Sequence, residues 1–147
     1  MQILIIQPHD TYQLRQLLPM HRNGQVPIAY PDDSDEKSFH LGNFVEKKLV
    51  SIASFYFSKH PDIDALYQYE VRGLTRPDMY RKGCSRALLE AAYPLILQNQ
   101  GHILWCYSSG DSIAALLAIG LKPIGSPQEI SDFFGTSVRQ LMYKRIQ

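Results

Sequence analysis

The stretch Tyr80-Arg81-Lys82-Gly83-Cys84-Ser85-Arg86-Ala87-Leu88-Leu89 decides the fold of this chain. It follows a strand-like run at 67–75 and opens a helix-like run that reaches Gln98. A basic, glycine-containing loop at such a junction directs backbone N–H groups and the positive end of a helix dipole at one point. Glycine also lets the backbone approach a ligand closely. The stretch therefore predicts a phosphate site.

Length and composition indicate an ordinary globular protein. The chain has 147 residues, of which 45% are apolar and 20% charged, and its net charge is +1. We therefore expect a single domain over 1–147. The balanced charge argues against a general nucleic-acid or membrane surface. Basic residues are locally dense around the loop, which favours a small anionic ligand over a polymer: Arg72, Arg76, Arg81, Lys82 and Arg86.

The cysteines and the N-terminus point to a cytoplasmic protein. Cys84 and Cys106 have no metal-ligand spacing, and a structural disulfide between them is not expected. The five histidines also lack metal spacing, so we expect surface or strand histidines and no metal. The apolar run at 2–6 is short and has no basic region or cleavage site, so it predicts a buried strand rather than a signal.

Hydrophobic periodicity predicts alternating strands and helices. We expect strands at 2–6, 39–45, 49–57, 67–75, 102–107, 121–124 and 137–146, and helices near 11–18, at 83–98 and at 111–119. The last two strands should form a hairpin around a loop rich in Pro, Gly and Asp. The acidic segment 31–37 is either a solvated turn or a lip over a substrate site. This order predicts a mixed sheet with helices on its faces.

Several strings in this order resemble the GCN5-related N-acetyltransferase (GNAT) superfamily. They are Gln68-Tyr-Glu-Val-Arg-Gly-Leu-Thr75, Pro77-Asp-Met-Tyr-Arg-Lys-Gly-Cys-Ser-Arg-Ala-Leu-Leu89, Ile103-Leu-Trp-Cys106, and Ala118-Ile-Gly-Leu121 followed by Gly125. The resemblance implies an α/β (α+β) fold with a central mixed, mostly antiparallel sheet, flanked by helices and splayed at the cofactor site. It also implies an acyltransferase of the EC 2.3.1 type that uses acetyl-coenzyme A as co-substrate and acetylates the amine of a small molecule or amino acid.

The resemblance assigns two groups of cofactor residues. The pantetheine arm would pair with the backbone near Gly73, Leu74 and Thr75, where an N–H would also stabilise the developing oxyanion. The pyrophosphate would lie over the loop and the helix terminus, formed by Arg81, Lys82, Gly83, Cys84 and Ser85, with Arg86 adding charge. Homodimers are frequent among the proteins it resembles, so a homodimer is a further expectation.

Glu70 and Tyr107 are the candidate catalytic residues. Glu70 would take a proton from the attacking ammonium, and its alternative role is a strand glutamate that faces solvent or pairs with Arg72. The family's usual acid is a tyrosine, but that position is Leu116 here. Tyr107 could replace the missing hydroxyl or could be a core aromatic residue.

The phosphate loop also departs from the family pattern. Tyr80 stands where the family has Gln or Arg, and Ser85 stands where it has Gly or Ala. These departures, with Leu116, leave open a second interpretation. In it, the chain is a non-catalytic acyl-coenzyme A binder or sensor with the same fold.

Overall fold

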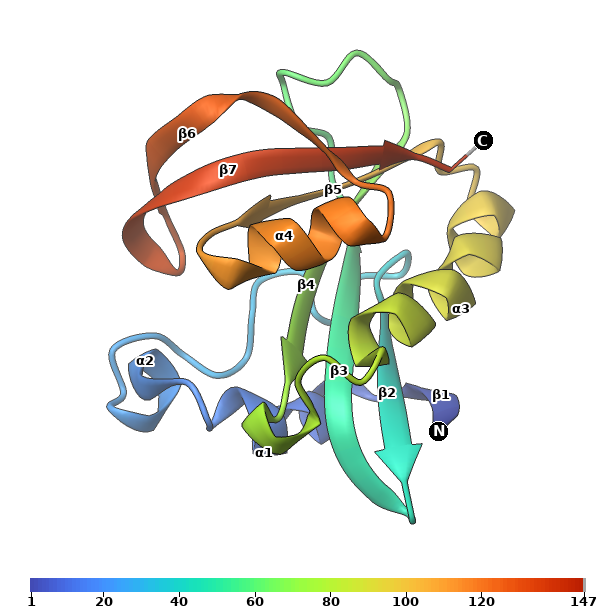
Figure 1. Cartoon of the computed structure of the whole chain (residues 1–147), viewed down its shortest axis with the longest axis vertical. Coiled ribbons are helices and arrows are strands. Elements are labelled where there is room, and N and C mark those ends of the chain that lie inside the picture. Colours follow the sequence, from blue (N-terminus) through green and yellow to red (C-terminus); the bar gives the residue numbers. More distant parts are fainter. Residues whose placement is uncertain (147) are drawn as a thin grey trace.

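The computed structural model describes residues 1–146, which form a seven-stranded sheet in the order β1-β2-β3-β4-β5-β7-β6 (Figure 1). The strands are β1 (Gln2–Ile6), β2 (Phe39–Val45), β3 (Lys48–Phe57), β4 (Gln68–Thr75), β5 (Ile103–Ser108), β6 (Lys122–Asp132) and β7 (Gly135–Arg145). The helices are α1 (Tyr12–Arg15), α2 (Pro19–Arg22), α3 (Cys84–Gln98) and α4 (Asp111–Ala118), with short 3-10 turns η1 (Pro8–Thr11) and η2 (Pro77–Met79).

The sheet is mixed and mostly antiparallel, as predicted. Every neighbouring pair of strands is antiparallel except β4 and β5, which run parallel because α3 connects them across one face of the sheet. The predicted order of strands and helices is confirmed.

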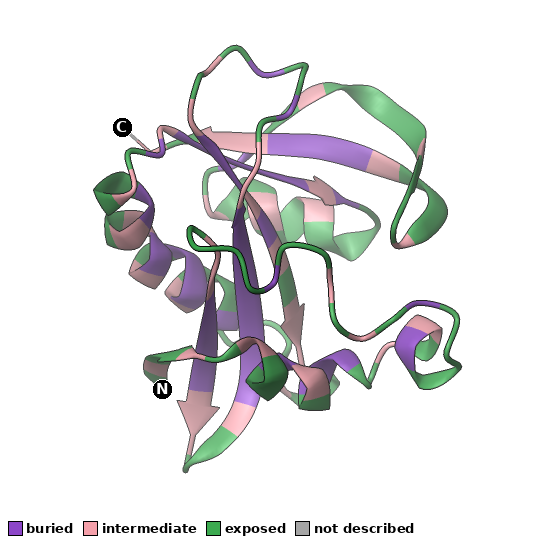
Figure 2. Ribbon diagram, turned by 180° about the vertical axis from the view of Figure 1, so that it is seen from behind, coloured by how far each residue is buried: buried purple, intermediate pink, exposed green. Residues whose placement is uncertain are grey.

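Helices α3 and α4 lie on one face of the sheet, and α1 and the chain between α2 and β2 lie on the other (Figures 1 and 2). The core between α3 and the sheet includes five fully buried residues: Phe55, Tyr69, Ala92, Ile96 and Leu104. Alternate strand residues face the opposite side. A smaller cluster of Ile63, Ile103, Trp105 and Leu141 lies there.

Three local predictions need correction. The strand β1 is correct but not buried, because it is an edge strand paired only with β2; Ile5 is 67% exposed. The helix expected near 11–18 is shorter: only Tyr12–Arg15 is α-helical, after η1, and a separate helical turn, α2, begins at Pro19. The closing hairpin is longer than predicted, because pairing with β7 extends β6 to Asp132 and leaves only a register shift between Ile124 and Gln128.

The acidic segment 31–37 is not simply a solvated turn. Asp33 is only 6% exposed and bonds to the buried guanidinium of Arg15. No helix within 1–146 has the length and apolar character needed to cross a membrane.

Candidate active site

The central feature of the site is a gap between β4 and β5. The two strands pair only over Gln68–Glu70 and 103–105. Beyond Glu70, β4 continues to Thr75 paired with β3 alone, and β5 continues to Ser108 paired with β7 alone. Each strand therefore leaves one edge of peptide groups without a strand partner, and an extended ligand can pair with such an edge.

The register of β3 and β4 decides which peptide groups face this gap. The N–H of Arg76 donates to the Val50 carbonyl at 2.9 Å, and Leu74 lies opposite Ile52 two residues further along. Because orientation alternates along a strand, the peptide groups of Leu74 point toward β3. Those of Val71, Gly73 and Thr75 point into the gap. Of the three residues expected to pair with pantetheine, Leu74 is thus turned away.

The predicted phosphate loop lies at the N-terminus of α3. Gly83 caps the helix with a left-handed backbone (φ 82°), and Arg81 is also left-handed (φ 63°). No side chain caps the helix, so the first-turn N–H groups are free of an intrahelical or capping partner. A Cβ built on Gly83 meets no atom within 4 Å, which means that the space over this backbone is open. Consecutive N–H groups in such a turn form an anion-binding concavity.

The cations of the loop are not equivalent. Arg81 and Lys82 are exposed. Arg86 instead donates to the Ala118 carbonyl at the end of α4 (3.1 Å) and lies 3.8 Å from Glu90. The side chain of Arg86 therefore joins α3 to α4. Cys84 is buried, with its side chain 3% exposed, and contributes its backbone rather than its thiol to the surface.

A cleft of about 490 Å³ continues from the gap. It is bounded by β4, the start of α3, β5, α4 and the turn between β6 and β7. Its lining includes four of the predicted site residues, Glu70, Gly73, Ser85 and Tyr107, together with Ser112 and Leu116. The structure thus brings the two candidate catalytic residues to one cavity.

Glu70 lies in this cleft and pairs with Arg72 at 2.8 Å. Its side chain is 12% exposed. Burial raises the pKa of Glu70, Arg72 acts against that shift, and Asp132 adds to it. Both roles considered for Glu70 are therefore compatible: it forms an ion pair and it faces the cavity, with a pKa moved toward that of a general base.

Tyr107 and Leu116 face the same cleft from β5 and α4. The Tyr107 hydroxyl is hydrogen-bonded to Nε2 of His60. Burial raises the pKa of Tyr107, and the charges of Asp62 and Glu70 raise it further. Leu116 has no proton to donate. Two phenols line this cavity, Tyr107 and Tyr30, and the Tyr30 hydroxyl is hydrogen-bonded to Nε2 of His21.

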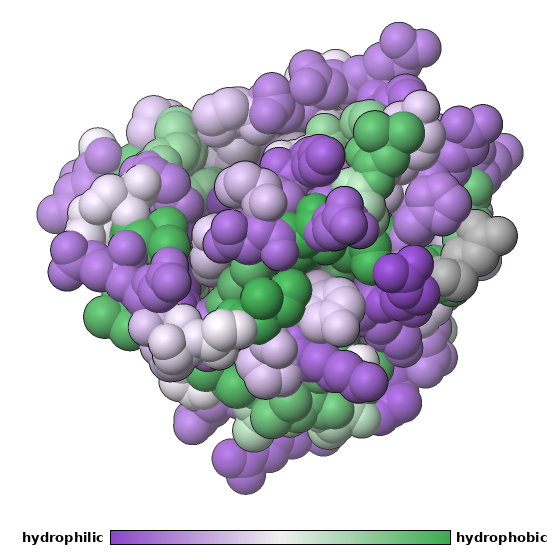
Figure 3. All heavy atoms as spheres, turned by 90° about the horizontal axis from the view of Figure 1, so that it is seen from above, coloured by the Kyte–Doolittle hydropathy of each residue, from purple (hydrophilic) through white to green (hydrophobic). Residues whose placement is uncertain are grey.

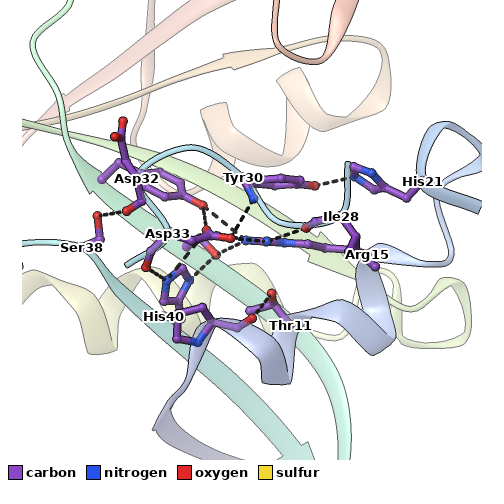
Figure 4. A network of polar contacts seen from close by, with 12 residues as sticks. Thr11, Arg15, His21, Ile28, Tyr30, Asp32, Asp33, Ser38 and His40 are labelled. Carbon is purple, nitrogen blue, oxygen red and sulfur yellow. Dashed lines mark hydrogen bonds and ion pairs between the residues drawn. The ribbon is translucent and has the colours of Figure 1, made fainter. Parts of the chain in front are cut away.

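A buried polar network supports the opposite wall (Figure 4). Asp33 accepts from Arg15 Nη1 at 2.8 Å and from the Tyr56 hydroxyl at 2.6 Å, and His40 bonds to the Asp33 carbonyl at 2.9 Å. The guanidinium of Arg15 lies 3.6 Å from the centre of the Tyr30 ring. This network fixes Tyr30, which lines the cleft.

Tyr30 packs edge-on against Phe134 at the turn between β6 and β7, with ring centres 4.7 Å apart. Arg72 stacks on the same Phe134 ring, with its guanidinium 3.7 Å from the ring centre. Tyr30 and Phe134 therefore form an aromatic wall of the cleft next to the Glu70–Arg72 pair.

Comparison with known proteins gives the same fold. No protein-family model matches the chain. The "Uncharacterized N-acetyltransferase YitI" of Bacillus subtilis (strain 168) is 26% identical over 100% of this chain and 97% of its own length. A ribosomal-protein-alanine N-acetyltransferase from Brucella melitensis superposes with a TM-score of 0.72 at 16% identity, covering 99% of both chains. The acetyltransferase yncA from Salmonella typhimurium, solved with acetyl-CoA, gives a TM-score of 0.73 at 14% identity, covering 100% of this chain and 94% of its own.

The chain has the fold of solved GCN5-related N-acetyltransferase (GNAT) structures, and it is similar over its full length to a curated N-acetyltransferase. The predicted fold is thereby confirmed, and the similarity to YitI agrees with the predicted family and with the predicted class of enzyme, an N-acetyltransferase. The gap between β4 and β5 is the splay that the resemblance implied.

Sequence reasoning missed several residues of this site. His60 was expected to be an ordinary surface or strand histidine, but it is 6% exposed and contacts Tyr107, 47 residues away in the chain. Tyr30 and Phe134 also carry no local motif. The pairing of Arg72 with Glu70 was not missed: it was one of the expected alternatives and is confirmed, since residues two apart on a strand share a face.

Proposed function

We propose that this GNAT protein transfers an acetyl group from acetyl-coenzyme A to the amine of a small molecule or amino acid. The observation that carries the proposal is the gap between β4 and β5, which opens at Glu70 and ends beside the uncapped N-terminus of α3. One continuous path thus leads from a candidate anion site to a carboxylate with a raised pKa.

The residues present fit the cofactor. We propose that the N–H groups of the Arg81–Arg86 segment hold the pyrophosphate, with added charge from Arg81 and Lys82. Peptide groups of Gly73 and Thr75 would pair with the pantetheine arm. The solved yncA structure carries acetyl-CoA, and an aminoglycoside 6'-N-acetyltransferase that superposes with a TM-score of 0.68 is complexed with coenzyme A.

In the proposed mechanism acetyl-coenzyme A supplies an activated acyl thioester. Glu70 accepts a proton from the acceptor ammonium, directly or through water, and so provides the neutral amine that attacks. A backbone N–H on the open edge of β4 donates to the oxygen on which negative charge develops. The Glu70–Arg72 ion pair holds the carboxylate in place, and the charge of Arg72 lowers its pKa against the effect of burial.

A second candidate function is a non-catalytic acyl-coenzyme A binder or sensor. It is motivated by Leu116, which lines the cleft where the family's acid would stand. Both functions require cofactor binding, so isothermal titration calorimetry with acetyl-coenzyme A tests them together. Absence of binding at millimolar cofactor would refute both.

Turnover separates the two functions. We would measure thiol release from acetyl-coenzyme A across a library of small amines and amino acids. Acceptor-dependent release supports the enzyme. Tight cofactor binding without release for any acceptor supports the binder or sensor. Glu70→Gln is the matched control, since it retains the size of the side chain and removes the base.

A further inference from the structure

The loop between β3 and β4 holds His60 against the end of β5. The imidazole packs edge-on against Trp105 and Tyr107, with ring centres 4.9 and 5.4 Å away. This loop and the β6–β7 hairpin lie at the end of the molecule seen in Figure 3, where small hydrophobic groups are interspersed with hydrophilic side chains. His60 itself is buried, so its ring is set by the contacts beneath that surface.

Buried hydrogen bonds fix the position of this loop. The N–H of His60 donates to Oε1 of Gln68 at 2.9 Å, and the Gln68 amide donates to the carbonyls of Ile63 and Ala65 at 2.8 Å each. Trp105 Nε1 donates to the Ser58 carbonyl at 2.9 Å. Gln68 is 1% exposed. Strands β4 and β5 thus hold both ends of the segment that carries His60.

The tautomer of His60 follows from a second backbone contact. The N–H of Asp62 donates to Nδ1 of His60 at 3.0 Å. A backbone N–H can only donate, so Nδ1 must be the unprotonated nitrogen. The neutral ring then carries its proton on Nε2. Burial lowers the pKa of His60, which outweighs the opposing charge of Asp62 and favours this neutral form.

The tautomer of His60 decides which group donates in its hydrogen bond with Tyr107. Nε2–H of His60 must donate to the Tyr107 oxygen, so the phenolic proton cannot be used in that bond. Within residues 1–146 the Tyr107 hydroxyl has no other hydrogen-bond partner, and Tyr107 lines the cleft that also contains Glu70. The free proton of Tyr107 is therefore available to a group bound in the cleft.

We propose that Tyr107 is the proton donor to the departing thiolate and that His60 is the positioning residue that frees the Tyr107 proton for this role. The inference rests on the proposed acetyl transfer. As the C–S bond breaks, its electron pair remains on sulfur, and the Tyr107 O–H proton moves to that sulfur. The resulting phenolate accepts the His60 Nε2–H. The acceptor nitrogen releases a proton on forming the amide, and water in the open cleft returns one proton to Tyr107.

The charges around Tyr107 are compatible with a phenol that stays protonated until it is needed. Asp62 from the β3–β4 loop, Glu70 from β4 and Asp132 from β6 raise the pKa of Tyr107, following burial as the largest cause, and Arg139 from β7 opposes them. The His60 Nε2–H also acts against that rise, because it stabilises the phenolate.

Nitrogen NMR on the histidine-labelled protein tests the tautomer without any turnover. At pH 8 we expect His60 to give the signals of a neutral ring that is protonated at Nε2. In the Gln68→Glu and Tyr107→Phe variants, Nδ1 should still give the signal of an unprotonated nitrogen. A ring protonated at Nδ1, or a doubly protonated ring at pH 7, would overturn the proposal.

Kinetics with acetyl-coenzyme A and hydroxylamine test the proton transfer. Hydroxylamine is neutral at pH 7.5, so its attack does not depend on Glu70. Tyr107→Phe should lower kcat by about 100-fold, the order expected for loss of a general acid, with KM for acetyl-coenzyme A changed by no more than about 3-fold. His60→Leu should cause a similar loss. His60→Gln, which keeps an N–H donor, should recover most of it.

The double variant distinguishes positioning from simple structural support. His60→Leu in the Tyr107→Phe background should lower kcat no further, because residues that act as one unit are not additive. Additive losses, or full activity of either single variant, would overturn the inference while leaving acetyl transfer intact. A wild-type protein that binds acetyl-coenzyme A without accelerating thiol release would instead refute the proposed function.

Discussion

Gly83→Ala separates the conformational role of this glycine from its role at a ligand. Gly83 has φ 82°, and a Cβ there would enter open space rather than clash with the protein. Placing a non-glycine residue in the left-handed region costs about 1–2 kcal/mol, partly offset by about 0.4–1 kcal/mol from the less flexible unfolded chain. We therefore expect a loss of about 1 kcal/mol in the free energy of unfolding, or roughly 2–4 °C in Tm.

The effect on coenzyme A should be larger than this stability loss. The added methyl group would lie over the N–H groups proposed to hold the pyrophosphate. Losing a hydrogen bond to a charged group costs about 1.5–3 kcal/mol, so Kd for coenzyme A should rise by about 10- to 100-fold. Calorimetry measures this directly. Pantetheine, which has no phosphate, should bind the variant and the wild type equally.

Gly24→Ala is the matched control. Gly24 also has a left-handed backbone (φ 74°) with no atom within 4 Å of a built Cβ. It should lose similar stability and keep its affinity for coenzyme A. Equal coenzyme A affinity in Gly83→Ala and Gly24→Ala would refute the assignment of the loop, and so would an equal loss of pantetheine binding in Gly83→Ala.

Three further predictions concern Glu70, Asp33 and Gly101. Because the pKa of Glu70 is raised by burial and held down by Arg72, acetyl transfer should increase with pH as Glu70 ionises. Arg72→Met should move that limb of the kcat/KM profile to higher pH, and Glu70→Gln should remove it; an unchanged profile in both would exclude Glu70 as the base. Burial acts to raise the pKa of Asp33, but hydrogen bonds from Arg15, Tyr56 and a backbone N–H outweigh it and lower the pKa. The stability from Asp33 is thus complete above the carboxyl pKa of the unfolded chain and is lost as pH falls through the lower folded-state value. Asp33→Asn should cost about 3–5 kcal/mol at pH 7 and weaken this acid dependence, as measured by urea unfolding. The exposed Asp35→Asn should stay within about 0.5 kcal/mol of wild type, and equal effects of the two would contradict the network in Figure 4. Gly101→Ala would place a Cβ 2.6 Å from Ile96 Cγ2 and 3.0 Å from a Tyr69 ring carbon, so it should cost about 1–3 kcal/mol; a variant with unchanged thermal unfolding would show that this contact relaxes freely.

Local sequence was sufficient where neighbours along the chain decide the structure. The Gly83 loop, the helix that follows it and the β2–β3 hairpin were predicted within a residue or two, because glycine conformation, helical spacing and strand alternation act over short distances. The Glu46–Lys47 turn, with both φ values positive, closes that hairpin as predicted.

The exposure of β1 and the burial of Asp33 could not be derived in this way. An apolar run such as 2–6 has the same sequence pattern at the edge of a sheet as at its centre, and only the position of β1 beside β2 alone exposes it. Likewise, Asp33 is one of several acidic residues in its segment. It is the one that reaches Arg15, on an element 18 residues earlier.

By itself the sequence determined the family resemblance, the phosphate loop and the residues that could carry acid–base chemistry. The tertiary structure alone decided how those groups are directed. The peptide groups of Leu74 point away from the gap, and the side chain of Arg86 is hydrogen-bonded to the end of α4. His60 contacts Tyr107, which lies 47 residues later in the chain. The physical reason is that hydrogen-bond direction depends on strand register and on contacts between distant segments, and a linear order of residue types does not contain either.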